Sequence, residues 1–357
     1  MDYLCRQKTF QQTLGAERLN GFVVTHPANL RYLCGYTGSN GLLLFLRERR
    51  VFFTDGRYTE QARDEVGGAR VVIARGPLLE AAGTLVGAVK AAIGFEGDHT
   101  TVATAADMRK LVGKKISWKP TSGLIMGQRM IKDAEEMKII REAVSMGAAV
   151  YEHALRSIRA GVRESEVAGE LEFAARRAGA DGMAFDTIVA AGKRSALPHG
   201  RASSQPIPRR GFVVVDSGVV LHGYCSDMTR TVHVGRASRE ERRWYDAVLE
   251  AQLAGIAAVK PGTTAGAVDH AARQVLRRHK LDRFFTHSTG HGVGLEIHEP
   301  PRLGKTQEET LQPGMVITIE PGVYLPDKGG IRIEDMVLVT KTGCQVLTPV
   351  SKVLMEI

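Results

Sequence analysis

The 357-residue sequence has few of the features that mark secreted, membrane-spanning or disordered proteins. Its four cysteines lie far apart and form no C-x-x-C pair, so we expect reduced thiols and no disulfide framework. No apolar run approaches the roughly 18 residues of a membrane span. The N-terminus lacks the basic and apolar regions of a signal peptide. Hydrophobic residues make up 43% of the chain, enough for a large core. These absences together predict a folded cytoplasmic protein that has no membrane partner.

The charge balance is basic, with 48 Lys and Arg against 39 Asp and Glu and a net charge of +9. Such a balance can indicate binding to nucleic acid. The basic residues are scattered along predicted helices, as at Arg239, Arg242 and Arg243, which is typical of solvent-facing helix surfaces. Neither zinc-finger spacing nor an aromatic platform for single strands accompanies them. We therefore expect no nucleic-acid partner.

Strand and helix patterns alternate in the first third of the chain. Short apolar runs predict strands at 21–25, 41–46 and 51–54, and helical patterns cover 58–65 and 78–93. This alternation predicts an α/β domain. The expected division of the chain is a first domain over 1–125, a linker over 126–132 and a second domain over 133–357.

The second domain contains a weak internal repeat. Long helices are predicted to begin after Asp133 and after Ser238, because each is followed three residues later by the Glu of a capping box. Each long helix is followed by a glycine turn and a shorter helix, and each pair leads to a His-Gly dipeptide, at His199 and at His291. This suggests two α-α-β halves that face each other, with a site in the cleft between them.

Four acids in this domain adjoin β-branched runs, where a buried carboxylate is costly unless it is paired or bound to a metal ion. Each acid taken alone is explained equally well as a solvent-exposed residue on an edge strand. Four such acids with a histidine in one domain indicate a metal site. They are Asp216, Asp227, Glu320 and Glu334, beside the runs 212–215, 228–231, 316–319 and 331–333.

A glycine-rich segment, 286–299, carries three histidines, His287, His291 and His298. The glycines allow the backbone to approach a ligand closely. Three histidines in so short a segment exceed what a hydrophobic core needs. One ring can bind a metal ion while the others contact a substrate.

Charge counting favours two metal ions. Four carboxylates carry a charge of −4, which two divalent ions neutralise, with a neutral imidazole as the fifth ligand. Oxygen ligands with one nitrogen suit Mn²⁺ or Co²⁺, and are compatible with Zn²⁺ or Fe²⁺. Two such ions can hold a bridging hydroxide as nucleophile and stabilise the oxyanion that forms.

The order Asp, Asp, His, Glu, Glu resembles the metallopeptidase family with the pita-bread fold, which includes methionine aminopeptidase, aminopeptidase P and prolidase. The segments 32–39 and 54–58 resemble the creatinase-type N-terminal domain of its proline-directed branch, a domain that methionine aminopeptidases lack. The resemblance implies an α/β (α+β) protein with a creatinase-like N-terminal domain and a pseudo-twofold pita-bread catalytic domain. The segments that match the family's metal-binding motifs are 216–218, 226–230, 291–294, 319–322 and 332–335.

The resemblance also implies residue roles. The metal ligands would be Asp216 on one ion, His291 and Glu320 on the other, and Asp227 and Glu334 on both. Glu320 would also be the general acid and base. Substrate-facing positions of the family match His199, His287 and His298, and positions that support the site match Arg332 and Tyr324.

The implied reaction is hydrolysis of the bond between an N-terminal residue and a following proline, in small peptides. Two alternatives remain open. The first concerns the length of the substrate, because prolidase cleaves dipeptides only whereas aminopeptidase P accepts longer peptides. Arg302 either binds the carboxylate of a dipeptide or is a surface arginine. The other alternative is a non-peptidase of the same fold, either creatinase-like or a peptide-binding module. The family resemblance further implies a homodimer formed through the N-terminal domain.

Overall fold

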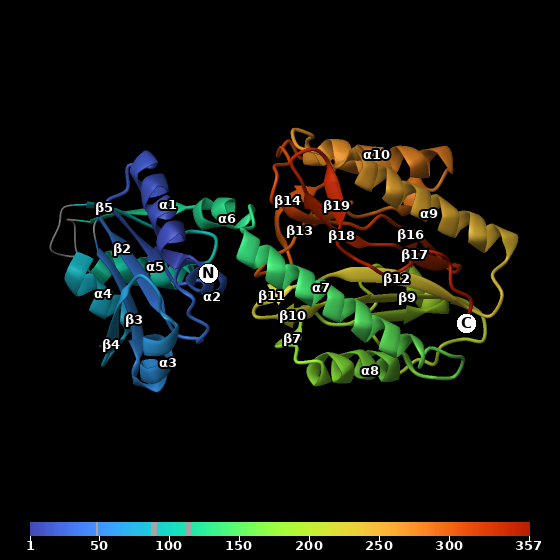
Figure 1. The fold of residues 1–357 in the computed structure, drawn as a ribbon, viewed down its shortest axis with the longest axis horizontal. Coiled ribbons are helices and arrows are strands. Elements are labelled where there is room, and N and C mark those ends of the chain that lie inside the picture. The colour runs from blue at the N-terminus through green and yellow to red at the C-terminus, as the bar shows by residue number, and fades with distance from the viewer. Residues whose placement is uncertain (48, 87–90, 112–115) are drawn as a thin grey trace. The chain divides into compact units, whose positions relative to one another are not determined.

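A computed structural model describes residues 1–47, 49–86, 91–111 and 116–357. The chain divides into two compact units, Met1–Arg129 and Met130–Ile357 (Figure 1). The division falls inside the expected linker 126–132, and the first part of that linker belongs to the helix that ends the N-terminal unit. No helix among the described residues is both long and apolar enough to cross a membrane.

The N-terminal unit is built on one six-stranded sheet in the order β4-β3-β2-β1-β5-β6. Strand β1 pairs antiparallel with β2 and parallel with β5, so the sheet is mixed. Its strands are β1 (Gly21–Val24), β2 (Leu42–Leu46), β3 (Arg49–Asp55), β4 (Arg70–Ala74), β5 (Ala91–Glu96) and β6 (Ile116–Thr121). Its helices are α1 (Tyr3–Ala16), α2 (Pro27–Cys34), α3 (Thr59–Glu65), α4 (Leu78–Val86), α5 (Val102–Leu111) and α6 (Leu124–Arg129), with a 3₁₀ turn η1 (Gly56–Tyr58). The strands expected at 21–25, 41–46 and 51–54 are confirmed to within a few residues.

The helix expected over 78–93 is wrong in its last part. Helix α4 ends at Val86, residues 87–90 lie outside the described part of the chain, and Ala91 begins strand β5. The alanine-rich pattern favours a helix locally. Ile93, however, lies in the interior of the sheet between Gly21 and Trp118, and it is almost completely buried. Pairing and burial in the sheet outweigh the weak helical preference.

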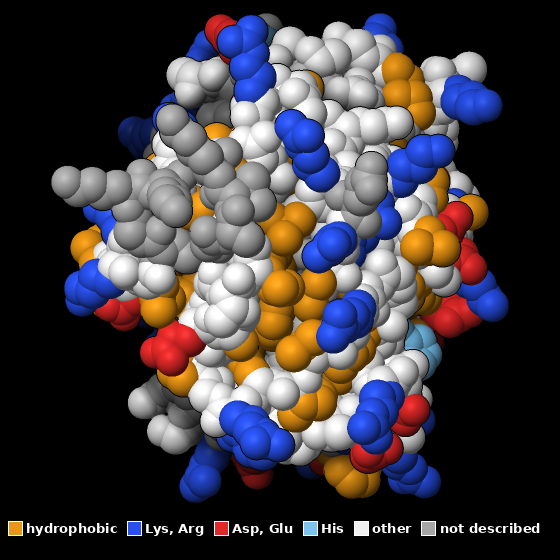
Figure 2. Space-filling model, turned by 90° about the vertical axis from the view of Figure 1, so that its left-hand side faces the viewer, with side chains coloured by type: hydrophobic (Ala, Val, Ile, Leu, Met, Phe, Trp, Pro, Cys, Tyr) orange, Lys and Arg blue, Asp and Glu red, His pale blue; other side chains and the backbone are white. Residues whose placement is uncertain are grey.

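Hydrophobic side chains gather on one face of the N-terminal unit, where Lys and Arg side chains lie around them (Figure 2). Partly buried apolar residues of this unit include Val72, Leu78, Leu85 and Trp118, which pack against its core.

The C-terminal unit shows the expected pairing of long and short helices. These are α7 (Ala134–Leu155) with α8 (Glu164–Arg177), and α9 (Arg239–Ala258) with α10 (Ala265–Arg278). The side chain of Asp133 accepts hydrogen bonds from the backbone N–H groups of Glu135 and Glu136 at the start of α7. Ser238 accepts one from Glu241 at the start of α9. Both predicted capping boxes are therefore confirmed.

Strands fill the space between the two helix pairs (Figure 1). One three-stranded sheet has the order β12-β9-β8 and a five-stranded sheet has the order β14-β13-β15-β18-β19. The strands of these sheets are β8 (Ile188–Ala191), β9 (Gly211–Ser217), β12 (Met228–Val234), β13 (Gly290–Gly292), β14 (Glu299–Leu303), β15 (Val316–Ile319), β18 (Asp335–Val339) and β19 (Cys344–Val346). Smaller elements are β7 (Gly182–Met183), β10 (Val219–Leu221), β11 (Tyr224–Cys225), β16 (Gly322–Leu325), β17 (Gly329–Arg332), η3 (Gly192–Ala196) and η4 (Asp282–Phe284).

Each helix pair covers its own hydrophobic cluster. Residues of α7 and α8, such as Tyr151 and Leu171, pack with Val213 of β9. Residues of α9 and α10, such as Val248 and Leu276, belong to a second cluster. The apolar stripe of each helix is thus buried against strands. The polar ends of those strands remain available for a site.

Candidate metal centre

The first half of the C-terminal unit supplies two acids from adjacent strands. Asp216 lies near the end of β9, and Asp227 immediately precedes β12. The antiparallel register places Asp216 opposite Thr229, two positions from Asp227. Residues two apart share a face of a strand, so both carboxylates reach the same side of the ladder.

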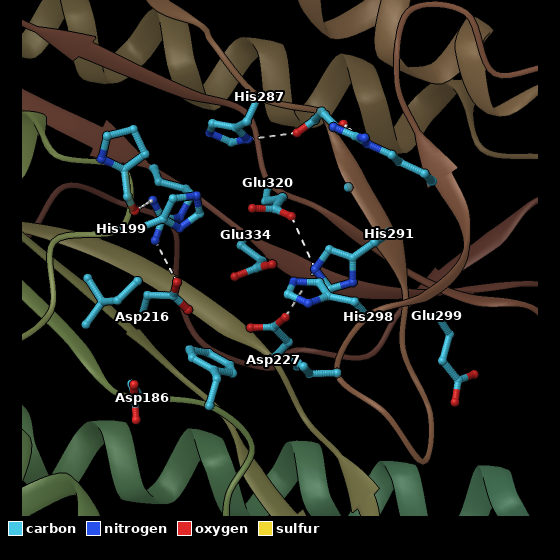
Figure 3. A pocket seen from close by; sticks show the side chains of 18 of the residues that line it. Asp186, His199, Asp216, Asp227, His287, His291, His298, Glu299, Glu320 and Glu334 are labelled. Atoms are coloured by element: carbon cyan, nitrogen blue, oxygen red, sulfur yellow. Dashed lines mark hydrogen bonds and ion pairs between the residues drawn. The ribbon is translucent and has the colours of Figure 1, made fainter. Parts of the chain in front are cut away.

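The second half supplies the other three candidate ligands. His291 is in the middle of β13, Glu320 follows β15, and Glu334 lies between β17 and β18. Strand β15 pairs with both β13 and β18, which brings the three positions together. Figure 3 shows that the five side chains converge on one cavity.

The cavity has a volume of about 910 Å³. Its apolar wall includes Phe185, Ile188 and Pro198. Ten of the residues that the sequence singled out line it, namely His199, Asp216, Asp227, His287, His291, His298, Arg302, Glu320, Arg332 and Glu334. The remaining one, Tyr324, contacts two of these side chains.

Three of the candidate ligands form a compact group: ligand atoms of Asp227, His291 and Glu334 all lie within 4.8 Å of one another. His291 Nε2 is 3.4 Å from Glu320 Oε1 and 3.6 Å from Asp227 Oδ2. Asp216 lies outside the compact group. Its Oδ1 atom is buried and has no hydrogen-bond partner among the described residues. A buried carboxylate oxygen without a partner is costly, and a bound cation would remove that cost.

Burial and mutual repulsion oppose ionisation of the clustered acids. Desolvation and then the neighbouring carboxylates raise the pKa of Asp227 and of Glu334 well above the ordinary range. Desolvation raises the pKa of Glu320 to about 8. Divalent ions would supply the missing positive charge, so the residues present fit a metal centre.

His291 has the protonation state that a metal ligand needs. Burial lowers the pKa of its ring to about 4, so the imidazole is neutral at neutral pH. Its Nδ1 atom is 3.0 Å from the Gly292 carbonyl oxygen and donates a hydrogen bond to it. The proton therefore resides on Nδ1, and Nε2 presents a lone pair to the centre of the cluster.

Arg332 links the clustered acids to their surroundings. Its guanidinium is buried and donates to Asp216 Oδ2 at 2.6 Å and to the Tyr324 hydroxyl at 2.7 Å. It also donates to the Pro198 carbonyl at 3.0 Å and to Thr229 Oγ1 at 3.1 Å. Each donor is thus satisfied by a different segment, which fixes the position of one Asp216 oxygen.

The three other histidines line the cavity at different depths. Burial lowers the pKa of His287 to about 3, and its Nε2 lies 2.9 Å from the Tyr324 hydroxyl. Desolvation also lowers the pKa of His298, an exposed residue of the cavity wall whose ring centroid is 4.4 Å from that of His291. His199 comes from the first half of the unit, after η3. Figure 3 shows His199 and His298 on two sides of the acidic cluster.

Comparison with known proteins agrees with this geometry. The model of metallopeptidase family M24 matches residues 138–341, and that of the creatinase/prolidase N-terminal domain matches residues 6–131. The first match alone covers more than half of the chain. The chain belongs to metallopeptidase family M24.

Relatives in this family include Xaa-Pro peptidases. The chain is 45% identical over 238 residues to the Xaa-Pro dipeptidase of Pyrococcus furiosus, covering 67% of this chain and 68% of the relative. The structure of an Xaa-Pro dipeptidase from Bacillus anthracis superposes with a TM-score of 0.96 at 39% identity, over 100% of both chains. That of an X-Pro aminopeptidase from Thermotoga maritima has a TM-score of 0.90 at 33% identity, over 98% of this chain and 100% of the other. The expected creatinase-like N-terminal domain and pita-bread catalytic domain are confirmed.

Several residues around the candidate metal centre were not anticipated from the sequence. Thr229 Oγ1 donates to Glu334 Oε2 at 2.7 Å, and Thr318 Oγ1 to Glu320 Oε1 at 3.3 Å. Each threonine lies two positions from one of the candidate ligands along the chain. That strand period could have identified them as neighbours on the same face.

A buried ion pair was also missed. Lys132 Nζ lies 3.0 Å from Glu299 Oε2, and both side chains are 1% exposed. Glu299 borders the cavity next to His298. The sequence gives no signal for this pair, because its members are 167 residues apart.

Proposed function

We propose that this M24 protein is a metal-dependent peptidase that hydrolyses the bond between an N-terminal residue and a following proline. The observation that carries the proposal is the convergence of two Asp, two Glu and one His on one cavity, in a chain whose relatives are described as Xaa-Pro peptidases. A non-peptidase of the same fold would not need all five ligand positions, so the peptidase is favoured.

The proposal assigns two divalent ions per subunit. Asp216 would hold one ion, His291 and Glu320 the other, and Asp227 and Glu334 both. The mixture of oxygen donors with one imidazole suits Mn²⁺ or Co²⁺, and Zn²⁺ or Fe²⁺ are alternatives. When bound, the ions supply an activated water and electrostatic stabilisation of the carbonyl oxygen as it gains negative charge.

The protein's own groups would handle the proton and the substrate. Glu320 is suited to accept the proton of the attacking water on its carboxylate and pass it to the proline nitrogen as the C–N bond breaks. Thr318 holds one oxygen of this carboxylate in place. His199 and His298 would donate hydrogen bonds to the substrate carbonyl. His287 was expected to face the substrate as well, but its two ring nitrogens bond to the Ser288 carbonyl and the Tyr324 hydroxyl. His287 would therefore support the acids, together with Tyr324 and Arg332.

Metal removal provides the first test. We expect chelation to abolish Xaa-Pro hydrolysis and to lower the thermal midpoint of the protein by about 5–10 °C, the shift that follows loss of about 2–3 kcal/mol in a domain of this size. The reason is that the acidic cluster loses its counter-charge. Calorimetry and assays before and after readdition of Mn²⁺ or Co²⁺ provide the measurement. Unchanged activity in protein shown to be metal-free would contradict the proposal.

The finer proposal is that dipeptides are preferred and that Arg302 binds their C-terminal carboxylate. Arg302 lines the cavity, lies opposite His291 in the β13–β14 register, and is oriented by Ser288, which accepts from its Nε at 2.6 Å. We expect Arg302→Ala to raise KM for an Xaa-Pro dipeptide by roughly tenfold or more, the loss of one charge-assisted hydrogen bond. KM for an Xaa-Pro-Xaa tripeptide should change little.

Arg201 offers a matched control for Arg302. It also lines the cavity and is exposed, but its guanidinium is paired with Asp186 at 2.7 Å. Arg201→Ala should leave the dipeptide KM within about twofold. Equal efficiency of the wild type on dipeptides and tripeptides, with no effect of Arg302→Ala, would favour a general Xaa-Pro aminopeptidase.

We further propose a cytoplasmic homodimer, in which the apolar face of the N-terminal unit in Figure 2 is part of the contact. Burial of such a face between two copies would be favourable. Light scattering at micromolar concentration tests the assembly, and a monomer would contradict it.

A further inference from the structure

Helix α10 carries a buried ion pair outside the metal centre. Asp269 and Arg273 are one helical turn apart, and Arg273 Nε donates to Asp269 Oδ2 at 2.7 Å. The Asp269 side chain is fully buried and that of Arg273 is 11% exposed. Surface pairs at this spacing contribute little to stability. The role of a buried pair depends instead on the contacts that its other polar atoms make.

The other polar atoms of Asp269 and Arg273 all form hydrogen bonds with one segment, residues 285–289. Arg273 Nη1 donates to the Phe285 carbonyl at 2.9 Å and Nη2 donates to the His287 carbonyl. The guanidinium carbon also lies 4.1 Å from the centre of the Phe285 ring. Asp269 Oδ1 accepts from the backbone N–H of Thr289 at 3.2 Å and from its hydroxyl at 2.9 Å. The pair therefore holds both ends of the segment to the helix.

The same segment contacts the site at two points. The His287 ring donates from Nδ1 to the Ser288 carbonyl at 2.8 Å, so its Nε2 accepts from the Tyr324 hydroxyl at 2.9 Å. That hydroxyl in turn accepts from Arg332, which donates to Asp216. At the other point, the Thr289 carbonyl accepts from the backbone N–H of Glu320 at 2.8 Å.

We propose that Asp269 and Arg273 are positioning residues for the peptidase: by clamping segment 285–289 to helix α10 they orient His287 toward Tyr324 and fix the backbone of Glu320. They touch neither the substrate nor a metal ligand's side chain, and act through the segment. The inference rests on the proposed function for its kinetic consequence, but the orientation of His287 can be observed without any activity.

The sharpest variant is Arg273→Lys. A lysine keeps a positive charge beside Asp269, so the buried carboxylate is not left unpaired. A single ammonium group, however, cannot donate to both carbonyls in the way that the two guanidinium NH₂ groups do. The matched control is Arg277→Lys on the same helix, where Arg277 is 69% exposed and lies 3.5 Å from Asp282. The measurements are kcat, KM, metal content, thermal midpoint and the histidine-ring ¹⁵N signals of Zn²⁺-loaded protein, with the His287 signal assigned from His287→Gln.

We expect Arg273→Lys to retain both metal ions, to lower kcat by roughly tenfold or more with KM within about threefold, and to move the His287 signal. Arg277→Lys should match the wild type in every measurement. An unchanged kcat in Arg273→Lys would overturn the proposal. A lower kcat with an unshifted His287 signal would also overturn it, because Asp269 and Arg273 would then not act through the His287 ring. If the wild type cleaves no Xaa-Pro peptide, the proposed function fails, and the His287 signal still decides whether the clamp orients the ring.

A second variant covers the case in which Arg273→Lys does not fold. Thr289→Val removes the hydroxyl that Asp269 accepts while keeping the volume of this fully buried side chain. We expect a fall in kcat of roughly fivefold, the effect of one lost hydrogen bond. An unchanged kcat in folded Thr289→Val would show that Asp269 does not position Glu320.

Discussion

Asp227→Ala and Glu334→Ala are each expected to abolish hydrolysis of Xaa-Pro peptides. Both carboxylates lie in the compact group around His291, and each is proposed to contact both ions. Loss of either therefore disturbs the whole centre. An effect of about 4 kcal/mol lowers a rate by roughly a thousandfold, and we expect kcat/KM to fall by at least this factor.

Metal content and kcat/KM measured on the same samples test this result. The control is Asp327→Ala, whose side chain is 88% exposed and lies 3.4 Å from Lys193. This control should keep full activity and both ions. Full activity in purified Asp227→Ala or Glu334→Ala would rule out a reaction that depends on two ions.

His298→Ala and His199→Ala are expected to keep both metal ions and the fold but to lose most of kcat. Both rings line the cavity without belonging to the proposed ligand set, and they come from different halves of the unit. An imidazole that donates a hydrogen bond to the reacting carbonyl is typically worth roughly a 10²–10³-fold rate effect. We expect a decrease of this size in each variant.

The control for the histidines is His279→Ala, a surface ring 2.7 Å from Glu250 at the end of α10. Its turnover should equal that of the wild type. Retained turnover in His298→Ala or His199→Ala would mean that these rings only order the cavity. Loss of metal in step with loss of rate would instead make them part of the metal centre.

Much of the site was predictable because its signals are local. An acid that ends an apolar β-branched run, as Asp216 and Glu320 do, is unfavourable without a partner, and this can be read from a few residues. The helix starts at Asp133 and Ser238 were equally visible, because a capping box spans only four positions. The family resemblance then suggested that these residues, in this order, are metal ligands.

Other features depend on groups that are far apart in the chain. The bond from Arg332 to Asp216 joins residues 116 positions apart, and no pattern in either segment indicates it. Residues 91–93 read as helix but form a strand, because their neighbours in the sheet come from β1 and β6. The hydrogen bond from Arg273 to the carbonyl of His287 likewise ends on a backbone atom. Every residue has such an atom, so the sequence does not indicate which one is bonded.

The sequence by itself determined which residues are candidates for the chemistry, where the long helices of the C-terminal unit begin, and that the candidate ligands lie at strand ends. Only the tertiary structure decided which of those groups meet, which oxygen of Asp216 is left without a partner, and how the histidines are oriented. The physical reason is the range of the interactions. Capping, strand alternation and the cost of burying a charge act within a few residues, whereas desolvation, charge repulsion and hydrogen bonding in the cavity depend on distances that only the folded chain sets.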